Sequence, residues 1–311
     1  MRVAATGASG LIGQALCARL EGAGYEVLRL VRAPVGSTSE NAPVKGIARW
    51  DPDGGWDDAE VLQDCSAVVH LAGESVGLGR WSEAKKARIL ESRERGTSVL
   101  ARALAGLPQP PPVLVSASAI GWYGDRGDEV LTEASASGTG FLAEVCRRWE
   151  VATEPARQAG IRVVLARTGI VLDRRGGSLA RQLLPFRLGL GGPLGSGRQW
   201  VSWITLADEV SALVRLLGEV ELAGPVNLTA PGSVTGAEFA RALGKALGRP
   251  ALLPLPAFAL SLVLGGERAR ELVLASQRVR PERLVAGGFT FEHPELATAL
   301  AAVLRKDLPR G

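Results

Sequence analysis

The sequence predicts an α/β protein: a doubly wound parallel sheet with a smaller, partly helical C-terminal region. Two observations carry this prediction. The chain opens on an apolar run too short for a helix, which leads into glycines at positions 7, 10 and 13 and then into a helical pattern. Further short apolar runs then alternate with helical patterns as far as about residue 171, as in βαβ units.

The composition describes an ordinary soluble globular chain. Its 311 residues are 46% hydrophobic and 22% charged, enough for two domains or one large one. The net charge is +4, but no basic run stands out, so no nucleic-acid partner is expected. Cys17, Cys65 and Cys146 are isolated and odd in number, which predicts neither disulfides nor a metal site and favours a reducing cytoplasm. Because the first strand starts at once, no cleaved signal peptide is expected.

The glycines have separate mechanical roles in a strand, turn and helix unit. Gly7 would allow the sharp exit from the strand, Gly10 the approach of a pyrophosphate, and Gly13 close packing of the helix. The phosphates would lie at the helix N-terminus, where free N–H groups favour negative charge. The context predicts a Rossmann-like dinucleotide site, against the alternative of a glycine-rich turn that binds nothing.

The second strand, residues 26–32, indicates which dinucleotide is bound. A site for NAD ordinarily places an acid at the end of this strand, whereas an arginine accommodates a 2′-phosphate. The strand ends at Leu30-Val31-Arg32 without an acid. We therefore predict NADP(H) as cofactor, with Arg32 on the 2′-phosphate, the alternative being a solvated loop arginine.

Residues 33–45 are predicted to form a loop, and residues 46–51 a third strand. The end of this strand would place Trp50 and Asp51 near the adenine of the cofactor. Trp50 could equally well pack in the core. The fourth strand, residues 66–70, ends in a turn of small residues that would let a ribose pass close to the backbone. His70, alone in this apolar strand, is predicted to be packed and hydrogen-bonded.

The middle of the chain continues the alternation. Residues 81–107 form a long helical pattern in which Arg93 is the candidate for a side chain that turns inward to the cofactor. A buried strand from residue 113 ends in two serines and an aromatic turn with Tyr123. A helix over 138–159 and a sixth strand over 161–167 follow.

The pattern changes character after the sixth strand. Residues 183–197 are glycine-rich yet apolar, which predicts a substrate-pocket loop or lid. Amphipathic helices are expected at 235–248 and 295–304. Residues 257–264 are the most apolar stretch but far shorter than the ~20 residues of a membrane span. They are predicted to form a buried helix, so no membrane partner is expected.

These elements predict two parts. Residues 1–170, with a return segment near 204–230, would form the Rossmann-like NADP-binding domain. Residues 171–203 and 231–311 would form a smaller substrate region.

The chain resembles the extended short-chain dehydrogenases/reductases typified by sugar-nucleotide epimerases. It is most similar to an atypical "epimerase family protein" group with a C-terminal domain of unknown function. The resemblance runs nearly end to end and is carried by the segments GASGLIG (7–13), HLAGE (70–74), RWSEAKKARILESR (80–93), FLAEVCRRWE (141–150), ARTGIVL (166–172), LPFRLGLGGPLGSGRQWVSWI (184–204), GPVNLTAP (224–231) and ASQRVRPERL (275–284).

The resemblance implies a cofactor site at the carboxyl edge of the sheet, with the C-terminal region closing over an unknown small-molecule substrate. The residues it assigns to the pyrophosphate are Gly7, Ser9, Gly10, Leu11, Ile12 and Gly13. Arg32 would select the 2′-phosphate. The residues that would line the ribose and nicotinamide are Leu71, Ala72, Gly73, Ser116 and Ala117. Arg93 and Arg167 are also counted as cofactor-binding.

One departure from the family concerns catalysis. These enzymes ordinarily use a Tyr-x-x-x-Lys pair on the helix after the serine-bearing strand, and here that helix reads Phe141-Leu-Ala-Glu-Val145. Either Ser118 polarises a carbonyl while Tyr123 or Glu144 moves the proton, or the protein senses NADP(H) without catalysis. Ser118 is also a common type of turn-former.

Three questions stay open on the sequence alone. Nucleotide-sugar binding without redox chemistry is favoured only if NADP(H) fails to bind. Arg147 and Arg148 are candidates to replace the missing lysine on the ribose, and a homodimer is left open.

Overall fold

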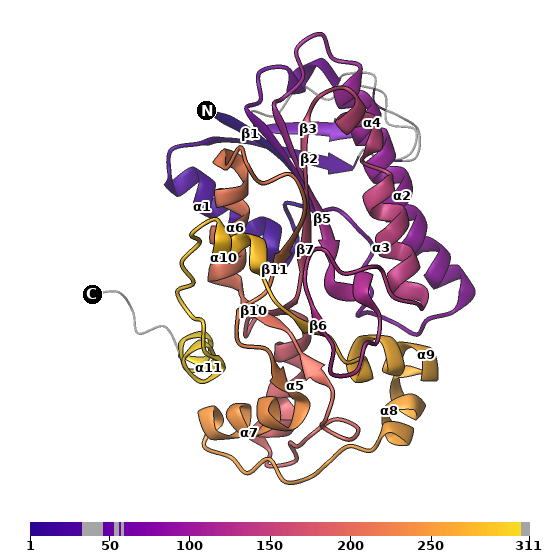
Figure 1. The fold of residues 1–311 in the computed structure, drawn as a ribbon, viewed down its shortest axis with the longest axis vertical. Coiled ribbons are helices and arrows are strands. Elements are labelled where there is room, and N and C mark those ends of the chain that lie inside the picture. Colours follow the sequence, from indigo (N-terminus) through magenta and orange to yellow (C-terminus); the bar gives the residue numbers. More distant parts are fainter. Residues whose placement is uncertain (33–45, 53–55, 57–58, 306–311) are drawn as a thin grey trace.

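The structure is a computed structural model that describes residues 1–32, 46–52, 56 and 59–305. The predicted loop at 33–45 lies outside these residues. Figure 1 shows a large twisted sheet in the N-terminal part and a smaller, mostly helical part at the opposite end of the molecule.

The predicted doubly wound parallel sheet is confirmed. Seven strands lie in the order β11-β7-β5-β4-β1-β2-β3, and every neighbouring pair is parallel. Their bounds are β1 Arg2–Thr6, β2 Glu26–Arg32, β3 Ile47–Trp50, β4 Ala67–His70, β5 Val113–Ala119, β7 Arg162–Thr168 and β11 Gly224–Leu228. The chain reverses its direction of travel across the sheet between β3 and β4, so the switch point lies between β1 and β4, where ligands of open α/β sheets bind.

Helices cover both faces of the sheet. One apolar core lies against α1 and α6, and a second lies against α2 and α4. The helix bounds are α1 Leu11–Gly22, α2 Glu83–Ala105, α3 Phe141–Val151, α4 Glu154–Gln158, α5 Gly177–Arg187, α6 Leu206–Gly218, α7 Gly236–Leu247, α8 Ala257–Leu264, α9 Gly266–Ala269, α10 Glu282–Ala286 and α11 Leu296–Leu304.

Local chemistry explains several helix starts. Ser82 and Thr205 each accept a backbone N–H of the first turn of the helix that follows them. Thr235 and Glu238 form a reciprocal capping box at the start of α7. The predicted helix over 138–159 is wrong in its extent, because Gly140 at φ +107° delays the start of α3 and a break at Ala152 and Thr153 separates α3 from α4.

The smaller part has its own apolar core, made by α5, α7, α11 and the short strands between them. These strands, with two that tie the C-terminal region to the sheet domain, are β6 Val130–Leu131, β8 Ile170–Leu172, β9 Trp200–Val201, β10 Trp203–Thr205, β12 Val234–Thr235 and β13 Arg278–Val279. Short helical turns span Ala59–Leu62, Ile120–Tyr123 and Arg270–Leu274. The β11 strand, from the predicted return segment, pairs with β7. The division into two units itself stays a prediction.

Two predictions about the smaller part were wrong. The stretch expected to be structureless from residue 183 is helical as far as Arg187, where α5 ends, so the irregular segment begins at Leu188. The α8 helix forms over the predicted residues but is not buried. Phe258 is 77% exposed and Leu262 79%, and only Leu260 is buried. In the described residues no helix has the length and apolarity that crossing a membrane requires.

Candidate functional site

The glycine turn joins β1 to α1 at the switch point of the sheet. Gly7 has a φ of +65°, and a Cβ there would lie 2.7 Å from the carbonyl carbon of Leu71. A Cβ at Gly13 would overlap the carbonyl oxygen of Gly7, so this glycine lets α1 pack directly on the turn. A Cβ at Gly10 would lie 3.3 Å from the same oxygen. Each glycine thus holds the backbone in a shape that a side chain would disturb.

The N-terminus of α1 is free of competing negative charge. Its first turn contains no acidic residue, and its N-cap, Gly10, has no side chain to accept the first N–H groups. Gly10 and Ser9 are exposed, and Leu11 and Ile12 are half-buried. The free backbone N–H groups and the positive end of the helix dipole therefore lie at the same turn, where the glycines leave room for a ligand. This is what the binding of a pyrophosphate requires.

The turn after β4 lies against this glycine turn and is fixed by β1. Thr6 Oγ1 accepts the N–H groups of Leu71 at 3.0 Å and Ala72 at 3.2 Å. Because that oxygen accepts twice, its own proton goes to His70 Nδ1 at 2.8 Å, and His70 Nε2–H donates to Thr97 at 3.0 Å. Burial lowers the pKa of His70 to about 4, with Arg93 adding to the effect. His70 is the packed, neutral residue that the sequence predicts.

Arg93 turns inward from α2 and lies beneath the same turn, while its predicted contact with the cofactor stays a prediction. Its Nη1 donates to the carbonyl oxygens of Glu74 at 2.8 Å and Ile89 at 3.1 Å, and its guanidinium lies 4.8 Å from the ring centroid of Trp149. Burial lowers its pKa to about 10. A Cβ on Gly73 would lie 3.1 Å from the guanidinium carbon, so Arg93 directly supports the Leu71–Gly73 turn.

Basic side chains gather where β2 ends. Arg32 is the exposed last residue of that strand, next to β1 in the sheet. A hydrogen bond from the buried Lys85 lowers the pKa of Glu74, and the charges of Lys85, Arg88 and Arg32 lower it further. Lys85 and Arg88 were not predicted to lie here, because nothing in a helical run of charges shows which of them face this edge. Trp50, at the end of β3, is 2% exposed and packs in the core.

Both serines near the end of β5 are buried. Ser116 is 0% and Ser118 4% exposed, whereas Ala117 between them is partly exposed. Ser118 Oγ donates to Glu150 Oε1 at 2.6 Å. Glu150 in turn is held by Arg167, whose Nε and Nη2 donate to its two oxygens at 2.9 Å each. The structure thus gives Ser118 and Arg167 a shared partner, Glu150, that was not predicted from the sequence.

Tyr123 is buried in the protein and is not exposed at the carboxyl edge of the sheet. Its side chain is fully buried, and its hydroxyl donates to Asn227 Oδ1 at 2.7 Å and accepts from Arg167 at 3.2 Å. Burial raises the pKa of this phenol. Its chemistry is therefore coupled to the buried Arg167 pair, and the catalytic role predicted for it stays untested.

The helix that ordinarily carries the tyrosine and lysine is α3. Phe141 stands at its first position, with its ring against Trp81 and Lys86, and Val145 is buried one turn later. The carboxylate of Glu271 accepts the N–H groups of Phe141 at 2.8 Å and Leu142 at 2.7 Å. The α3 N-terminus is therefore capped by a residue of the C-terminal region.

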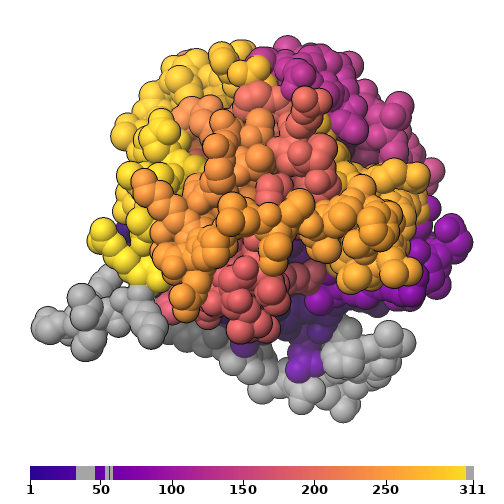
Figure 2. All heavy atoms as spheres, turned by 90° about the horizontal axis from the view of Figure 1, so that it is seen from below, coloured from indigo at the N-terminus to yellow at the C-terminus, as the bar shows by residue number. Residues whose placement is uncertain are grey.

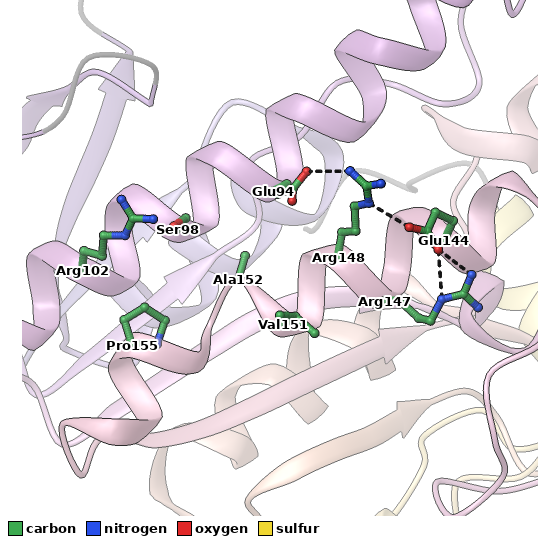
Figure 3. A pocket seen from close by; sticks show the side chains of 9 residues that line it. All are labelled: Glu94, Ser98, Arg102, Glu144, Arg147, Arg148, Val151, Ala152 and Pro155. Carbon is green, nitrogen blue, oxygen red and sulfur yellow. Dashed lines mark hydrogen bonds and ion pairs between the residues drawn. The ribbon is translucent and has the colours of Figure 1, made fainter.

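Arg147 and Arg148 point to the outer side of α3. Both donate to Glu144, and Arg148 also lies 3.5 Å from Glu94 of α2. Figure 3 shows these ion pairs along an open groove between α2, α3 and α4. The groove has a volume of about 500 Å³ and is lined by Glu94, Ser98, Arg102, Glu144, Arg147, Arg148, Val151, Ala152 and Pro155. None of the residues predicted to hold the pyrophosphate, the 2′-phosphate or the nicotinamide lines it, so we do not assign the cofactor to it. Arg147 and Arg148, the candidates for the ribose, do line it and are paired with Glu144 instead. The described residues contain no group of histidine, cysteine and acidic side chains arranged for a metal ion.

Comparison with known proteins gives a consistent result. Residues 3–228 match the model of the NAD dependent epimerase/dehydratase family, and residues 255–303 match a domain of unknown function, DUF1731. The chain is 46% identical over 298 residues to epimerase family protein Mb2239 of Mycobacterium bovis, covering 96% of both chains. It is 38% identical over 309 residues to human epimerase family protein SDR39U1, covering 98% of this chain and 100% of that one.

Solved structures agree with the sequence matches. The crystal structure of human epimerase family protein SDR39U1 (isoform 2) with NADPH superposes with a TM-score of 0.87 at 37% identity, covering 97% of this chain and 99% of that chain. A nucleoside-diphosphate sugar epimerase from Corynebacterium glutamicum gives a TM-score of 0.77 at 38% identity, over 98% of this chain and 58% of that one.

Proposed function

Because this chain belongs to the NAD dependent epimerase/dehydratase family, we propose that it binds NADP(H) across the carboxyl edge of its sheet and acts there as an oxidoreductase or epimerase on a small molecule. The glycine turn is the observation that carries the proposal. Gly7, Gly10 and Gly13 form a cradle that Cβ atoms would fill, at a helix N-terminus without a side-chain cap. The similarity to a human relative crystallised with NADPH supports the phosphorylated form of the cofactor.

Each part of the cofactor is bound by a different group of residues. The pyrophosphate lies on the first N–H groups of α1, along Ser9, Leu11 and Ile12. Arg32 pairs with the 2′-phosphate, and the Leu71–Gly73 turn, held by Thr6 and Arg93, lines the ribose path. The cofactor supplies or accepts the hydride, and the protein must orient the substrate and deal with one proton.

Ser118 is the residue that we assign to the substrate. Its only hydroxyl proton is donated to the Glu150 carboxylate, which Arg167 holds in place. The lone pairs of Ser118 Oγ are then what it offers to a ligand. Ser118 therefore accepts a hydrogen bond from a substrate hydroxyl, which favours an alcohol over the carbonyl that the sequence suggested.

A second candidate function is NADP(H) sensing without turnover. The observation that favours it is that α3, the helix on which the family ordinarily carries its acid/base tyrosine and its lysine, contains neither residue type. A cofactor site can remain intact when the group that moves the proton has been lost.

Titration of NADPH and NADH tests the cofactor assignment. We expect wild type to bind NADPH more tightly, and Arg32→Ala to lose tenfold or more of its NADPH affinity, since a charge-assisted hydrogen bond contributes roughly 1.5–3 kcal/mol. Its NADH affinity should not change. Arg19→Ala, at the far end of α1, is the matched control. Equal affinity of wild type for the two cofactors would contradict the assignment, and failure to bind either would favour nucleotide-sugar binding without redox chemistry.

Turnover separates the enzyme from the sensor. Purified protein is incubated with NADP⁺ and a panel of alcohols and nucleotide sugars, and with NADPH and the matching carbonyl compounds, while absorbance at the NADPH band is followed and nucleotide-sugar epimers are resolved by chromatography. An enzyme gives a signal that Ser118→Ala reduces at least tenfold while NADPH affinity is retained. Tight NADPH binding without turnover above background on any compound would establish the sensor.

A further inference from the structure

The largest concentration of exposed apolar side chains lies on the smaller part of the molecule. In the described residues, nine of the 17 exposed large hydrophobic side chains fall in two segments, 184–190 and 252–263. We call them the apolar surface. Its members are Leu184, Leu188, Leu190, Leu252, Leu253, Leu255, Phe258, Leu262 and Val263. An exposed apolar cluster of this size marks a contact site with a protein or a membrane.

The two segments lie side by side. Leu253 N donates to Gly191 O at 3.2 Å and Leu255 N to Pro193 O at 2.9 Å, and α8 follows immediately. Arg249 Nε donates to the carbonyl of Arg187 at the end of α5. Figure 2 shows these segments together on the face of the molecule seen from below. The two segments that carry the apolar surface are therefore joined through residues 191–193 and 253–255.

The two segments that carry the apolar surface contain charges of one sign only. Residues 177–200 and 239–266 contain six basic residues and no aspartate or glutamate. These basic residues, all exposed, are Arg181, Arg187, Arg198, Arg241, Lys245 and Arg249. The neighbouring acids are engaged elsewhere: Glu238 caps α7, Glu267 binds Lys86, and Glu271 caps α3.

We propose that the apolar surface docks on an anionic phospholipid bilayer, with α8 lying in the plane of the headgroups. Apolar side chains inserted at the boundary and surrounded by arginine and lysine are the combination that holds peripheral proteins on such bilayers. The α8 helix has eight residues, far too short to cross, and Leu260 anchors it to the body of the protein. The prediction of no membrane partner depended on this run being too short to span a bilayer and on its being buried, and the structure exposes it.

The charge pattern disfavours a second copy as the occupant. A two-fold dimer through this face would bring the same basic residues together from both protomers, and like charges across an interface repel. An anionic bilayer instead attracts the exposed basic residues of these segments. This proposal is independent of the cofactor and of any turnover.

Vesicle co-sedimentation of the full chain tests the proposal. Vesicles of phosphatidylcholine alone are compared with vesicles of phosphatidylcholine and phosphatidylglycerol. We expect the protein to pellet with the anionic vesicles and not with the neutral ones, and to be released as salt is raised, since exposed charges are screened. Absence of binding to anionic vesicles, or equal binding to both kinds, would overturn the proposal.

Two sets of variants locate the contact. Phe258→Asp with Leu262→Asp should reduce vesicle binding at least tenfold, while Val220→Asp, at an equally exposed valine after α6, should not. Lys245→Gln with Arg249→Gln should weaken it about 25-fold, or about fivefold per charge. Circular dichroism and NADPH affinity report whether each variant is folded.

The oligomeric state supplies the remaining outcomes. If the wild-type protein forms a dimer, we expect the double variant Phe258→Asp with Leu262→Asp to form it equally well in sedimentation equilibrium. A dimer that the double variant dissociates, without vesicle binding, would assign the apolar surface to a second copy and overturn the proposal. Vesicle binding that this double variant leaves unchanged would overturn it as well.

Discussion

Single residues near the cofactor edge act through the groups that they hold. Thr6 fixes the Leu71–Ala72 backbone, and its own proton fixes the tautomer of His70. Glu150 receives the only hydroxyl proton of Ser118. The glycine turn could be predicted because its backbone shape follows from local spacing, and the role of Arg32 at the 2′-phosphate stays a prediction. The sequence did not supply Glu150 or Glu271, because nothing local in a sequence shows which acid a distant residue will meet.

Glu209, on α6, is a buried acid with an unusual environment. Its Oε1 accepts from Thr168 at 2.8 Å, and its Oε2 lacks a hydrogen-bond partner among the described residues. Burial raises its pKa from 4.5 to about 8, with the Thr168 hydrogen bond opposing the shift. Between these values the unfolded chain releases a proton that the folded chain keeps. The stability that this group contributes is therefore full below about pH 4.5 and is lost as the pH rises to about 8.

Glu209→Gln should remove this pH dependence. The amide keeps an oxygen for Thr168 and carries no charge, so we expect the variant to be more stable than wild type at pH 8, by roughly 2 to 4 kcal/mol, and nearly equal to it at about pH 5. Urea unfolding at the two pH values measures this. Glu60→Gln, at an exposed acid, is the control. A variant whose stability falls with pH as steeply as wild type would contradict the role of Glu209.

At the scale of elements, secondary structure was easier to predict than its environment. The α8 helix formed where the apolar run predicted, yet burial depends on what packs over it, and in the described residues Phe258 and Leu262 stay exposed. The long helix predicted over 138–159 divides into α3 and α4. The sequence shows which side chains are apolar, but the tertiary structure decides which of them are buried.

The capping of α3 is an element-scale contact that can be measured. Glu271 accepts the backbone N–H groups of Phe141 and Leu142, which the N-cap residue Gly140 cannot bind because it has no side chain. Glu271→Ala should therefore lower the free energy of unfolding by about 1–2 kcal/mol, measured by urea unfolding. Glu267→Ala, which removes a part-exposed ion pair with Lys86, should cost less than about 1 kcal/mol. If the two variants were equally stable, the carboxylate of Glu271 would not be acting as a cap.

At the scale of the whole molecule, alternating strands and helices were sufficient to predict a doubly wound parallel sheet. The carboxyl ends of its strands bring Gly7, Leu71, Ser118 and Arg167 to one edge. What the alternation could not predict is how the C-terminal region closes on this edge. That contact depends on Glu271 and on the pairing of β13 with β6, which join positions far apart in the chain.

That distance has a consequence for synthesis on the ribosome. Ser276 N donates to Asp125 across 151 positions, and the β13 strand that completes β6 follows directly. The chain emerges from its N-terminus, so the backbone groups of β6 that pair with β13 must wait for that pairing until β13 has been translated. The loop that carries β6 therefore gains its long-range partners late, and until then it is open to proteases and chaperones while the chain is being made.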